Sequence, residues 1–185
     1  RRLWAAARYA VWLAGRPEAG GAAYADSALV LANTAVEADS ARVEGYYYRA
    51  LATGFVARAN PLTGRSAMRR IREDASRALA LDSAFDAGGP HRALGALYLR
   101  APGPPVGVGS LNRAVQHLEA AHRIAPEHPD NLLFLAEAYL DAGRAEEARR
   151  LLDRAAAIEA KDPGEEEWRR AWARELRDRL RSGAR

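Results

Sequence analysis

One spacing of small and apolar residues occurs four times along this chain, and it limits the folds that the chain can adopt. Each occurrence places four positions at intervals of 4, 3 and 5 residues. The four sets are Ala28, Ala32, Ala35 and Ser40; Ile71, Ala75, Ala78 and Ser83; Ala114, Leu118, Ala121 and Pro126; and Ala148, Leu152, Ala155 and Ala160. Intervals of three and four bring side chains onto one face of an α-helix. The spacing therefore predicts four helices of one kind, each able to approach a neighbouring helix closely.

The distances between these sets indicate the repeating unit. Their last positions lie 43, 43 and 34 residues apart, and a tetratricopeptide repeat is a helix pair of about 34 residues. The last two units also show the first-helix pattern of such a repeat, as Leu94, Gly95 and Tyr98 and as Leu132, Leu135, Ala136 and Tyr139. The β-branched residues are few and scattered, so no segment resembles a strand. We therefore predict an all-α, tetratricopeptide-like solenoid of about four antiparallel helix pairs.

The repeat register gives expected boundaries within a single domain. The predicted repeats occupy residues 1–40, 41–83, 84–126 and 127–160 of the domain 1–185. A further helix over 162–182 is expected to cap the last repeat, with Asp162 as its N-cap and Pro163 at its first helical position. Its apolar face contains Trp168, Trp172, Leu176 and Leu180. Repeat arrays need such a terminal helix, which buries one face on the last repeat and exposes the other face to solvent.

The residues needed for catalysis or metal binding do not occur in a productive pattern. The chain has no cysteine, no phosphate-binding glycine loop and no nucleophile elbow. Its four histidines are His91, His117, His122 and His128. The spacing of five between His117 and His122 does not place them on one helix face, as a metal-binding pair would require. We therefore expect no enzyme activity, no cofactor and no metal.

Charge and hydropathy narrow the partners further. The formal net charge is +4, from 28 basic and 24 acidic residues that are interspersed along the helices. Such patterning is typical of a solvated helix face and not of a basic stripe, so we expect no nucleic-acid partner. The longest apolar run, Trp4–Ala14, has only 11 residues and includes Arg8, whereas a membrane-spanning helix needs about 18.

Three consecutive tyrosines, Tyr46, Tyr47 and Tyr48, are candidate binding residues. Successive helix positions point about 100° apart, so the three side chains cannot all face the same core. One hypothesis is that at least one of them lines a groove, where the apolar ring and polar tip of tyrosine are both useful. The alternative is that two of them pack between repeats and the third is half exposed.

Groove-facing positions of the first helices supply further candidates. The register assigns to the groove Arg92, Ala96 and Leu99 in the third unit and Asp130, Leu133, Glu137 and Leu140 in the fourth. Because first helices stack side by side, we expect Arg92 and Glu137 to form a charge pair inside the groove. The segment 88–92 is either a simple turn between repeats or part of this groove. The apolar loop 101–109 either docks a partner or packs over its own helix pair.

The run from Glu44 to Leu152 resembles a known family, the tetratricopeptide proteins associated with tripartite ATP-independent periplasmic (TRAP) transporters. The matching pieces are YYYRAL at 46–51, ALALD at 78–82, GGPHRALGALY at 88–98, the loop 101–109, Ala125-Pro126 and NLLFLAE at 131–137. A plain repeat array needs neither the Gly-Gly-Pro segment nor the proline-rich loop.

This resemblance implies a function and a location. Members of the family are periplasmic, are often lipid-anchored, and are partners of the transporter's solute-binding protein. They are thought to form homo-oligomers around a pore and to handle hydrophobic or organic-acid ligands. A lipid anchor on this chain requires a cysteine in a leader segment upstream of Arg1.

The predictions combine into two functional hypotheses. The first is a non-catalytic periplasmic scaffold that binds a solute-binding protein, a small hydrophobic or carboxylate ligand, or both. Its cavity is expected to be lined by aromatic rings, and the guanidinium group of Arg92 would bind a carboxylate through two hydrogen bonds. The expected rings are those of Trp12, Tyr46, Tyr47, Tyr48 and Tyr98. The alternative is a general protein–protein adaptor that holds an extended peptide in its concave groove.

Overall fold

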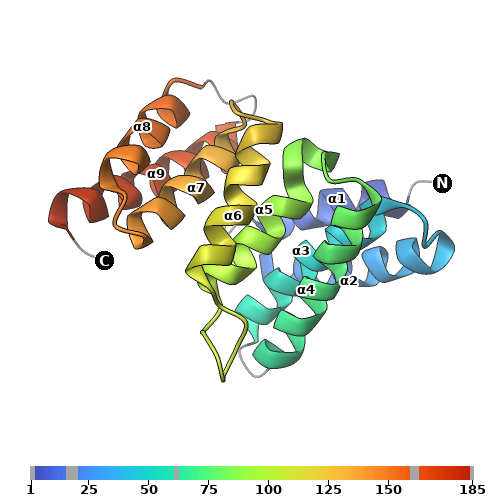
Figure 1. The fold of residues 1–185 in the computed structure, drawn as a ribbon. Helices are drawn as coiled ribbons and strands as arrows, with labels where there is room; N and C mark the ends of the chain where they lie inside the picture. Colours follow the sequence, from blue (N-terminus) through green and yellow to red (C-terminus); the bar gives the residue numbers. More distant parts are fainter. Residues whose placement is uncertain (1–2, 16–20, 61–62, 159–162, 184–185) are drawn as a thin grey trace.

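The computed structural model describes residues 3–15, 21–60, 63–158 and 163–183, which form nine α-helices (Figure 1). The helices are α1 (Leu3–Ala14), α2 (Gly21–Ala38), α3 (Val43–Ala59), α4 (Gly64–Leu81), α5 (Phe85–Arg100), α6 (Leu111–Ile124), α7 (Pro129–Asp141), α8 (Ala145–Ala156) and α9 (Pro163–Ser182). No helix within these residues is long and apolar enough to cross a membrane.

The helices are arranged as a solenoid of helix pairs. Each helix up to α8 packs on the next one in the chain, and every odd-numbered helix also contacts the following odd-numbered helix. The odd-numbered helices α1, α3, α5, α7 and α9 therefore form one continuous layer. Figure 1 shows the pairs following one another from α1–α2 at one end of the molecule to α8–α9 at the other. The prediction of an all-α solenoid of helix pairs with a capping helix is confirmed.

Small residues of the repeated spacing lie where the paired helices approach. Ala28, Ala32, Ala75, Ala78, Ala114, Leu118, Ala121 and Ala148 are all fully buried. Gly95 of α5 shows how tight this approach is, because a Cβ on it would lie 2.5 Å from the Cγ of Leu118 on α6. The last position of the fourth set, Ala160, and the predicted N-cap Asp162 lie outside the described residues.

The hydrophobic core has two clusters of different composition. The first, built mainly from α1 to α5, consists largely of alanines together with Tyr47, Tyr48 and Tyr98. The second, built from α6 to α9, consists largely of leucines, such as Leu132 and Leu135, together with Trp172. Small side chains allow helices to approach closely but bury less apolar area per residue than leucine does.

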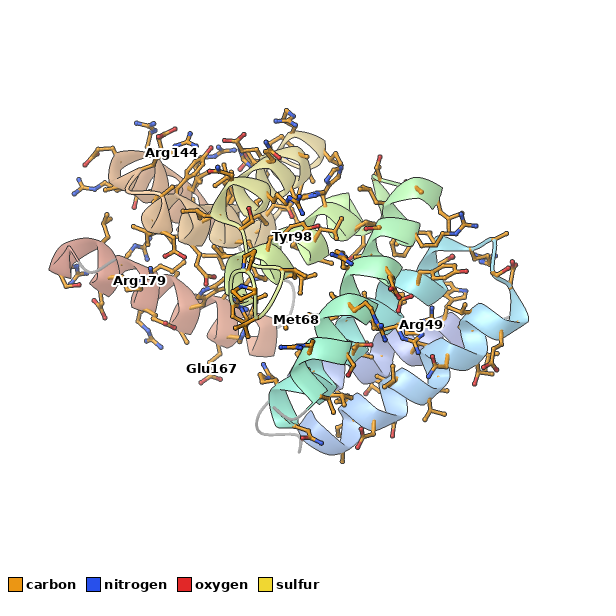
Figure 2. All side chains as sticks on the ribbon, turned by 60° about the horizontal axis from the view of Figure 1, so that its bottom comes forward. Arg49, Met68, Tyr98, Arg144, Glu167 and Arg179 are labelled. Carbon is orange, nitrogen blue, oxygen red and sulfur yellow. The ribbon has the colours of Figure 1, made fainter. Side chains whose placement is uncertain are left out.

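The proline-rich loop between α5 and α6 is held by its own backbone and by α4. The N–H of Gly109 donates to the carbonyl of Pro102 (2.8 Å), and the N–H of Ser110 donates to that of Tyr98 (2.8 Å). Met68 of α4 lies beside the loop, where its sulfur would be 3.1 Å from a Cβ placed on Gly107 (Figure 2). The loop therefore closes on its own backbone and packs against α4 of the preceding helix pair, and its docking role stays a prediction.

The final helix closes the array. Trp172 and Leu176 of α9 are buried against the leucine-rich cluster. Arg177 donates to the carbonyl of Leu152 at 2.9 Å, and this bond joins α9 to α8. On the same face and nearer the start of α9, Trp168 remains 43% exposed, and its ring centroid lies 5.1 Å from that of Trp172. The helix therefore covers the last repeat with the C-terminal part of this face and leaves an aromatic side chain accessible at the N-terminal part.

Candidate binding groove

A long groove follows the layer of odd-numbered helices. Its volume is about 2000 Å³, and its walls come from α1, α3, α5, α7 and α9 together with the turn between α6 and α7. All four tryptophans of the chain line it: Trp4, Trp12, Trp168 and Trp172. The helix that caps the array is thus also the last wall of its groove.

The groove lining follows helix periodicity, because each inner helix contributes residues about four positions apart. In α1 these are Trp4, Arg8 and Trp12, and in α3 they are Tyr48, Leu51 and Phe55. The same stripe continues as Ala96 and Arg100 in α5, Asp130 and Phe134 in α7, and Trp168 and Trp172 in α9. Aromatic rings therefore gather at both ends of the groove.

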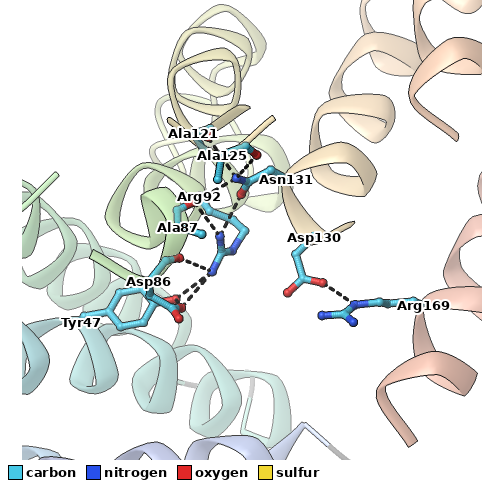
Figure 3. Close-up of polar contacts among 9 residues, drawn as sticks. All are labelled: Tyr47, Asp86, Ala87, Arg92, Ala121, Ala125, Asp130, Asn131 and Arg169. Atoms are coloured by element: carbon cyan, nitrogen blue, oxygen red, sulfur yellow. Dashed lines mark hydrogen bonds and ion pairs between the residues drawn. The ribbon is translucent and has the colours of Figure 1, made fainter. Parts of the chain in front are cut away.

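A buried arginine lies at the centre of the groove wall (Figure 3). Arg92 is only 7% exposed. Its Nη2 donates to the Tyr47 hydroxyl (3.1 Å) and to Oδ2 of Asp86 (3.0 Å), and its Nη1 donates to Oδ1 of Asn131 (2.8 Å). The Tyr47 hydroxyl in turn donates to Asp86 at 2.5 Å. Both terminal nitrogens of Arg92 are therefore engaged within the protein.

Asn131 joins this network to the backbone of three segments. It is fully buried, and its amide nitrogen lies 2.9, 3.0 and 3.2 Å from the carbonyl oxygens of Ala87, Ala121 and Ala125. The carbonyl of Ala87 belongs to a left-handed turn, because Asp86, Ala87 and Gly88 have φ values of 50°, 57° and 81°. Non-glycine residues rarely adopt this conformation without support from their surroundings. Arg92 and Asn131 supply that support from α5 and α7.

The ionisation of the network follows from its burial. Burial raises the pKa of Tyr47, so its phenol stays protonated and remains a donor to Asp86. Burial disfavours the charge of Arg92, but Tyr47, Asp130 and Asp86 outweigh it and raise the pKa of the guanidinium. The charge of Arg92 is thus retained and is balanced inside the protein.

Comparison with known proteins agrees with this architecture. A sequence model described as tetratricopeptide repeat matches residues 106–170. A crystal structure of a thermophilic TPR protein from Thermus thermophilus is similar over 96% of this chain and 98% of that chain, with a TM-score of 0.61 and 19% identity. The chain has the tetratricopeptide-repeat fold. No curated protein sequence matches it significantly.

The inner surface of a tetratricopeptide solenoid is an extended concave binding surface. The fold and the match over residues 106–170 are those of tetratricopeptide repeats, whose concave face generally mediates protein–protein interactions. The described residues contain no group of three or more histidine or acidic side chains placed to hold a metal ion. The nearest histidine pair, His91 and His117, has its Nδ1 atoms 3.0 Å apart and forms a hydrogen bond between α5 and α6.

The expected charge pair between Arg92 and Glu137 is wrong. Glu137 instead binds Arg100, with 2.8 Å between Oε2 and Nη2. Arg92 follows Pro90 by two residues, just as Asn131 follows Pro129, so these two side chains lie level in the stacked tetratricopeptide helices. Glu137 lies nearly two turns further along α7, where α5 presents Arg100.

The three consecutive tyrosines separate as helix geometry requires. Tyr47 and Tyr48 are buried and line the groove, where both contact Phe85 edge-on. Tyr46 is half-buried on another face of α3, with its ring 5.3 Å from the Arg49 guanidinium. The alternative with two packed tyrosines and one partly exposed describes this arrangement, although the two packed rings also form the groove wall.

The other candidates divide between the groove and the core of the tetratricopeptide array. Trp12 lines the groove and stacks on Tyr9, with 5.6 Å between ring centroids. Tyr98 is buried and stacks on His117 at 5.6 Å, and Leu133 is 1% exposed in the leucine-rich cluster. Tyr46, Tyr98, Leu133 and Glu137 are not among the groove-lining residues. The binding roles of all the candidates stay predictions.

Several groove residues were missed by the sequence analysis. They are Trp4, Arg8, Tyr9, Phe55, Arg58, Phe134, Trp168 and Trp172. The missed residues of α1 and α9 do carry a signal in the sequence. Trp4 and Arg8 precede Trp12 at intervals of four residues, and Trp168 and Trp172 are also four residues apart. The recurrence in α9 indicated only a buried face, because nothing in a capping helix shows that it also closes a groove.

Proposed function

We propose that this solenoid is a non-catalytic scaffold that holds a segment of a partner protein along its concave groove. The position of all four tryptophans on the groove wall carries the proposal. Aromatic side chains are enriched at protein interfaces, where they supply most of the binding energy. Small-molecule sites usually have volumes of about 300–1,000 Å³, so a groove of about 2000 Å³ favours a longer occupant.

A narrower candidate for the partner is the periplasmic solute-binding protein of a TRAP-type transporter. The resemblance over residues 44–152 supports it, and two segments of that resemblance have defined places in this fold. The Gly-Gly-Pro segment follows the left-handed turn held by Arg92 and Asn131, and the proline-rich loop packs over α4. With this partner we also propose a periplasmic location, a lipid anchor from an upstream leader segment, and a homo-oligomer. A small hydrophobic or carboxylate ligand is a further candidate occupant of the groove.

Binding of the solute-binding protein encoded nearest to this chain is expected to be visible by native mass spectrometry. The same mixture should shift tryptophan emission to shorter wavelengths, because a groove occupant covers the exposed ring of Trp168. A Trp168→Phe variant is the control, since it should bind but show a smaller shift. A complex that leaves the emission unchanged would place the contact outside the groove.

Other outcomes separate the candidate partners. If the mixture contains no complex, the transporter link is contradicted. The scaffold proposal is then tested separately, by measuring whether peptides bind to the protein. A melting temperature that rises with organic acids in the absence of any protein partner would favour the small-ligand occupant, because a ligand stabilises the folded state to which it binds.

A further inference from the structure

We propose that the α1–α3 end of the groove recognises an acidic segment of the partner protein, in which Asp or Glu alternates with aromatic or aliphatic residues. This inference rests on the proposed scaffold function and specifies the chemistry of the partner. Its basis is the way in which charge and aromatic surface are distributed along the groove. The argument concerns five arginines that line the groove: Arg8, Arg58, Arg92, Arg100 and Arg169.

Three of these arginines already have carboxylate partners within the protein. Arg92 binds Asp86 at 3.0 Å, and Arg100 binds Glu137 at 2.8 Å. Arg169 of α9 binds Asp130 of α7, with 2.8 Å between Nε and Oδ1 (Figure 3). In the middle of the groove and at its α7–α9 end, the positive charges of these arginines are therefore already balanced, and Glu127 and Glu175 add negative charge to the lining. A carboxylate arriving there would have to displace an existing partner.

The remaining two arginines, at the α1–α3 end, differ in this respect. Among the described residues, neither Arg8 nor Arg58 has a carboxylate within ion-pair distance. Arg58 lies over the ring of Phe55, 5.0 Å from its centroid, and its Nη2 is 3.5 Å from the carbonyl of Ala14 at the end of α1. Both side chains are exposed, so both remain accessible to an incoming group.

Among the described residues, the two acids that act on Tyr48 at this end are already engaged. Glu44 accepts hydrogen bonds from Arg42, and Asp86 accepts them from Tyr47 and Arg92. Both acids and Arg8 affect the pKa of Tyr48, which burial raises, so these charges surround the same part of the groove wall. Within the part of the chain that the structure describes, these two accessible guanidinium groups therefore have no internal counter-ion beside a low-dielectric wall, and such a wall strengthens their attraction for an anion.

Aromatic rings surround the two arginines and indicate what accompanies the negative charge. Tyr9 and Trp12 form a stacked pair on α1, with an interplanar angle of 19°, and Tyr9 is 62% exposed. Trp4 and Tyr48 extend this surface toward the interior of the groove. A guanidinium group binds a carboxylate through two parallel hydrogen bonds, while the rings offer apolar area to neighbouring side chains. In an extended peptide, successive side chains point to opposite sides, so an alternating acidic and apolar pattern fits both surfaces.

Nucleic acid is a less suitable occupant. Its affinity depends on many phosphate contacts by basic side chains, and the described residues at this end of the groove offer two arginines without a carboxylate partner, Arg8 and Arg58. The three other arginines that line the groove are bound to acids.

Selection from a displayed library of random 12-residue peptides tests the inference directly. Wild-type protein is compared with an Arg8→Glu/Arg58→Glu variant and with a matched Arg65→Glu/Arg69→Glu variant. The control makes the same change of charge at exposed positions of α4, which are not among the groove-lining residues. Circular dichroism checks that all three proteins are folded, and an Arg8→Gln/Arg58→Gln variant separates loss of attraction from added repulsion.

We expect the wild type to enrich peptides with Asp or Glu next to, or two positions from, an aromatic or aliphatic residue. Their affinity, measured by fluorescence polarisation, should fall about tenfold or more in the groove charge-reversal variant and by less in the glutamine variant. It should stay unchanged in the α4 control. Raising the salt concentration should also weaken binding to the wild type.

Three results would overturn the inference. The first is that the enriched peptides are neutral or basic. The second is that the substitutions at Arg8 and Arg58 leave the peptide affinity unchanged. The third is that a twelve-residue oligothymidine binds more tightly than the peptides. If no peptide is enriched by any of the proteins, the scaffold proposal itself fails, and that outcome is distinct from the other three.

Discussion

An Arg92→Ala variant is expected to lose about 3 kcal/mol of its free energy of unfolding, because the substitution leaves buried polar groups without partners. Asn131, which is fully buried, would lose the donor to its side-chain oxygen, and Tyr47 would lose the charge that lies beside its hydroxyl. The left-handed turn at 86–88 would lose one of its two supports. Urea unfolding followed by circular dichroism measures the change.

The matched control for this prediction is Arg100→Ala in the same helix. Arg100 is 51% exposed, binds Glu137 and lies over the rings of Phe134 and Trp172, so its removal is expected to cost only about 1 kcal/mol. Asn131→Ala should resemble Arg92→Ala, and the double variant should be less destabilised than the sum of the two, because both changes disrupt one network. Equal effects at Arg92 and Arg100, or strict additivity with Asn131, would contradict a shared buried network.

A second large effect is expected where α5 and α6 cross. Leu118→Ala should destabilise the protein by about 3 kcal/mol, because it opens a cavity at a fully buried position. Gly95→Ala alone should also destabilise it, by about 1–2 kcal/mol, since the new methyl group would lie 2.5 Å from Cγ and 2.6 Å from Cδ2 of Leu118. This clash outweighs the gain of about 1 kcal/mol that alanine has over glycine in a helix.

The two substitutions at this crossing are expected to compensate each other. In the Leu118→Ala background both clashing atoms are absent, so Gly95→Ala should become stabilising, and its effect on the unfolding midpoint should change sign. Gly54→Ala in α3 is the control, because the nearest atom to its new Cβ is 3.9 Å away and only the gain in helix propensity remains. Destabilisation by Gly95→Ala in both backgrounds would mean that Leu118 does not set the spacing of the helices.

Local spacing in the sequence was sufficient to predict the helix pairs. Alanines at intervals of three and four occupy the close contacts between helices, and Pro163 begins the final helix as expected. These features depend on residues that are near one another in the chain. For that reason helix periodicity alone identifies them.

The partners of individual polar groups were harder to predict, because they depend on how distant helices align. Assigning Arg92 to Glu137 required the register between α5 and α7. In that register Arg92 lies level with Asn131, and Arg100 lies level with Glu137. The left-handed turn at 86–88, which Arg92 and Asn131 support, was not predicted either. Asp86 and Ala87 carry no sequence signal for positive φ values, since such conformations are unusual for residues other than glycine. The groove role of α9 was missed for a related reason, since it depends on the curvature of the whole array.

The change from alanine to leucine packing partway along the chain has a consequence for native-state fluctuations. Repeat arrays are stabilised by neighbouring interfaces, so different stretches can open independently. The alanine-rich α1–α4 half should therefore exchange its amide hydrogens with solvent faster than α7 and α8, whose leucines are almost fully buried. Arg8 and Arg58 belong to this looser half. A partner that docks on them would slow hydrogen exchange there, so recognition and local stiffening would occur together at one end of the molecule.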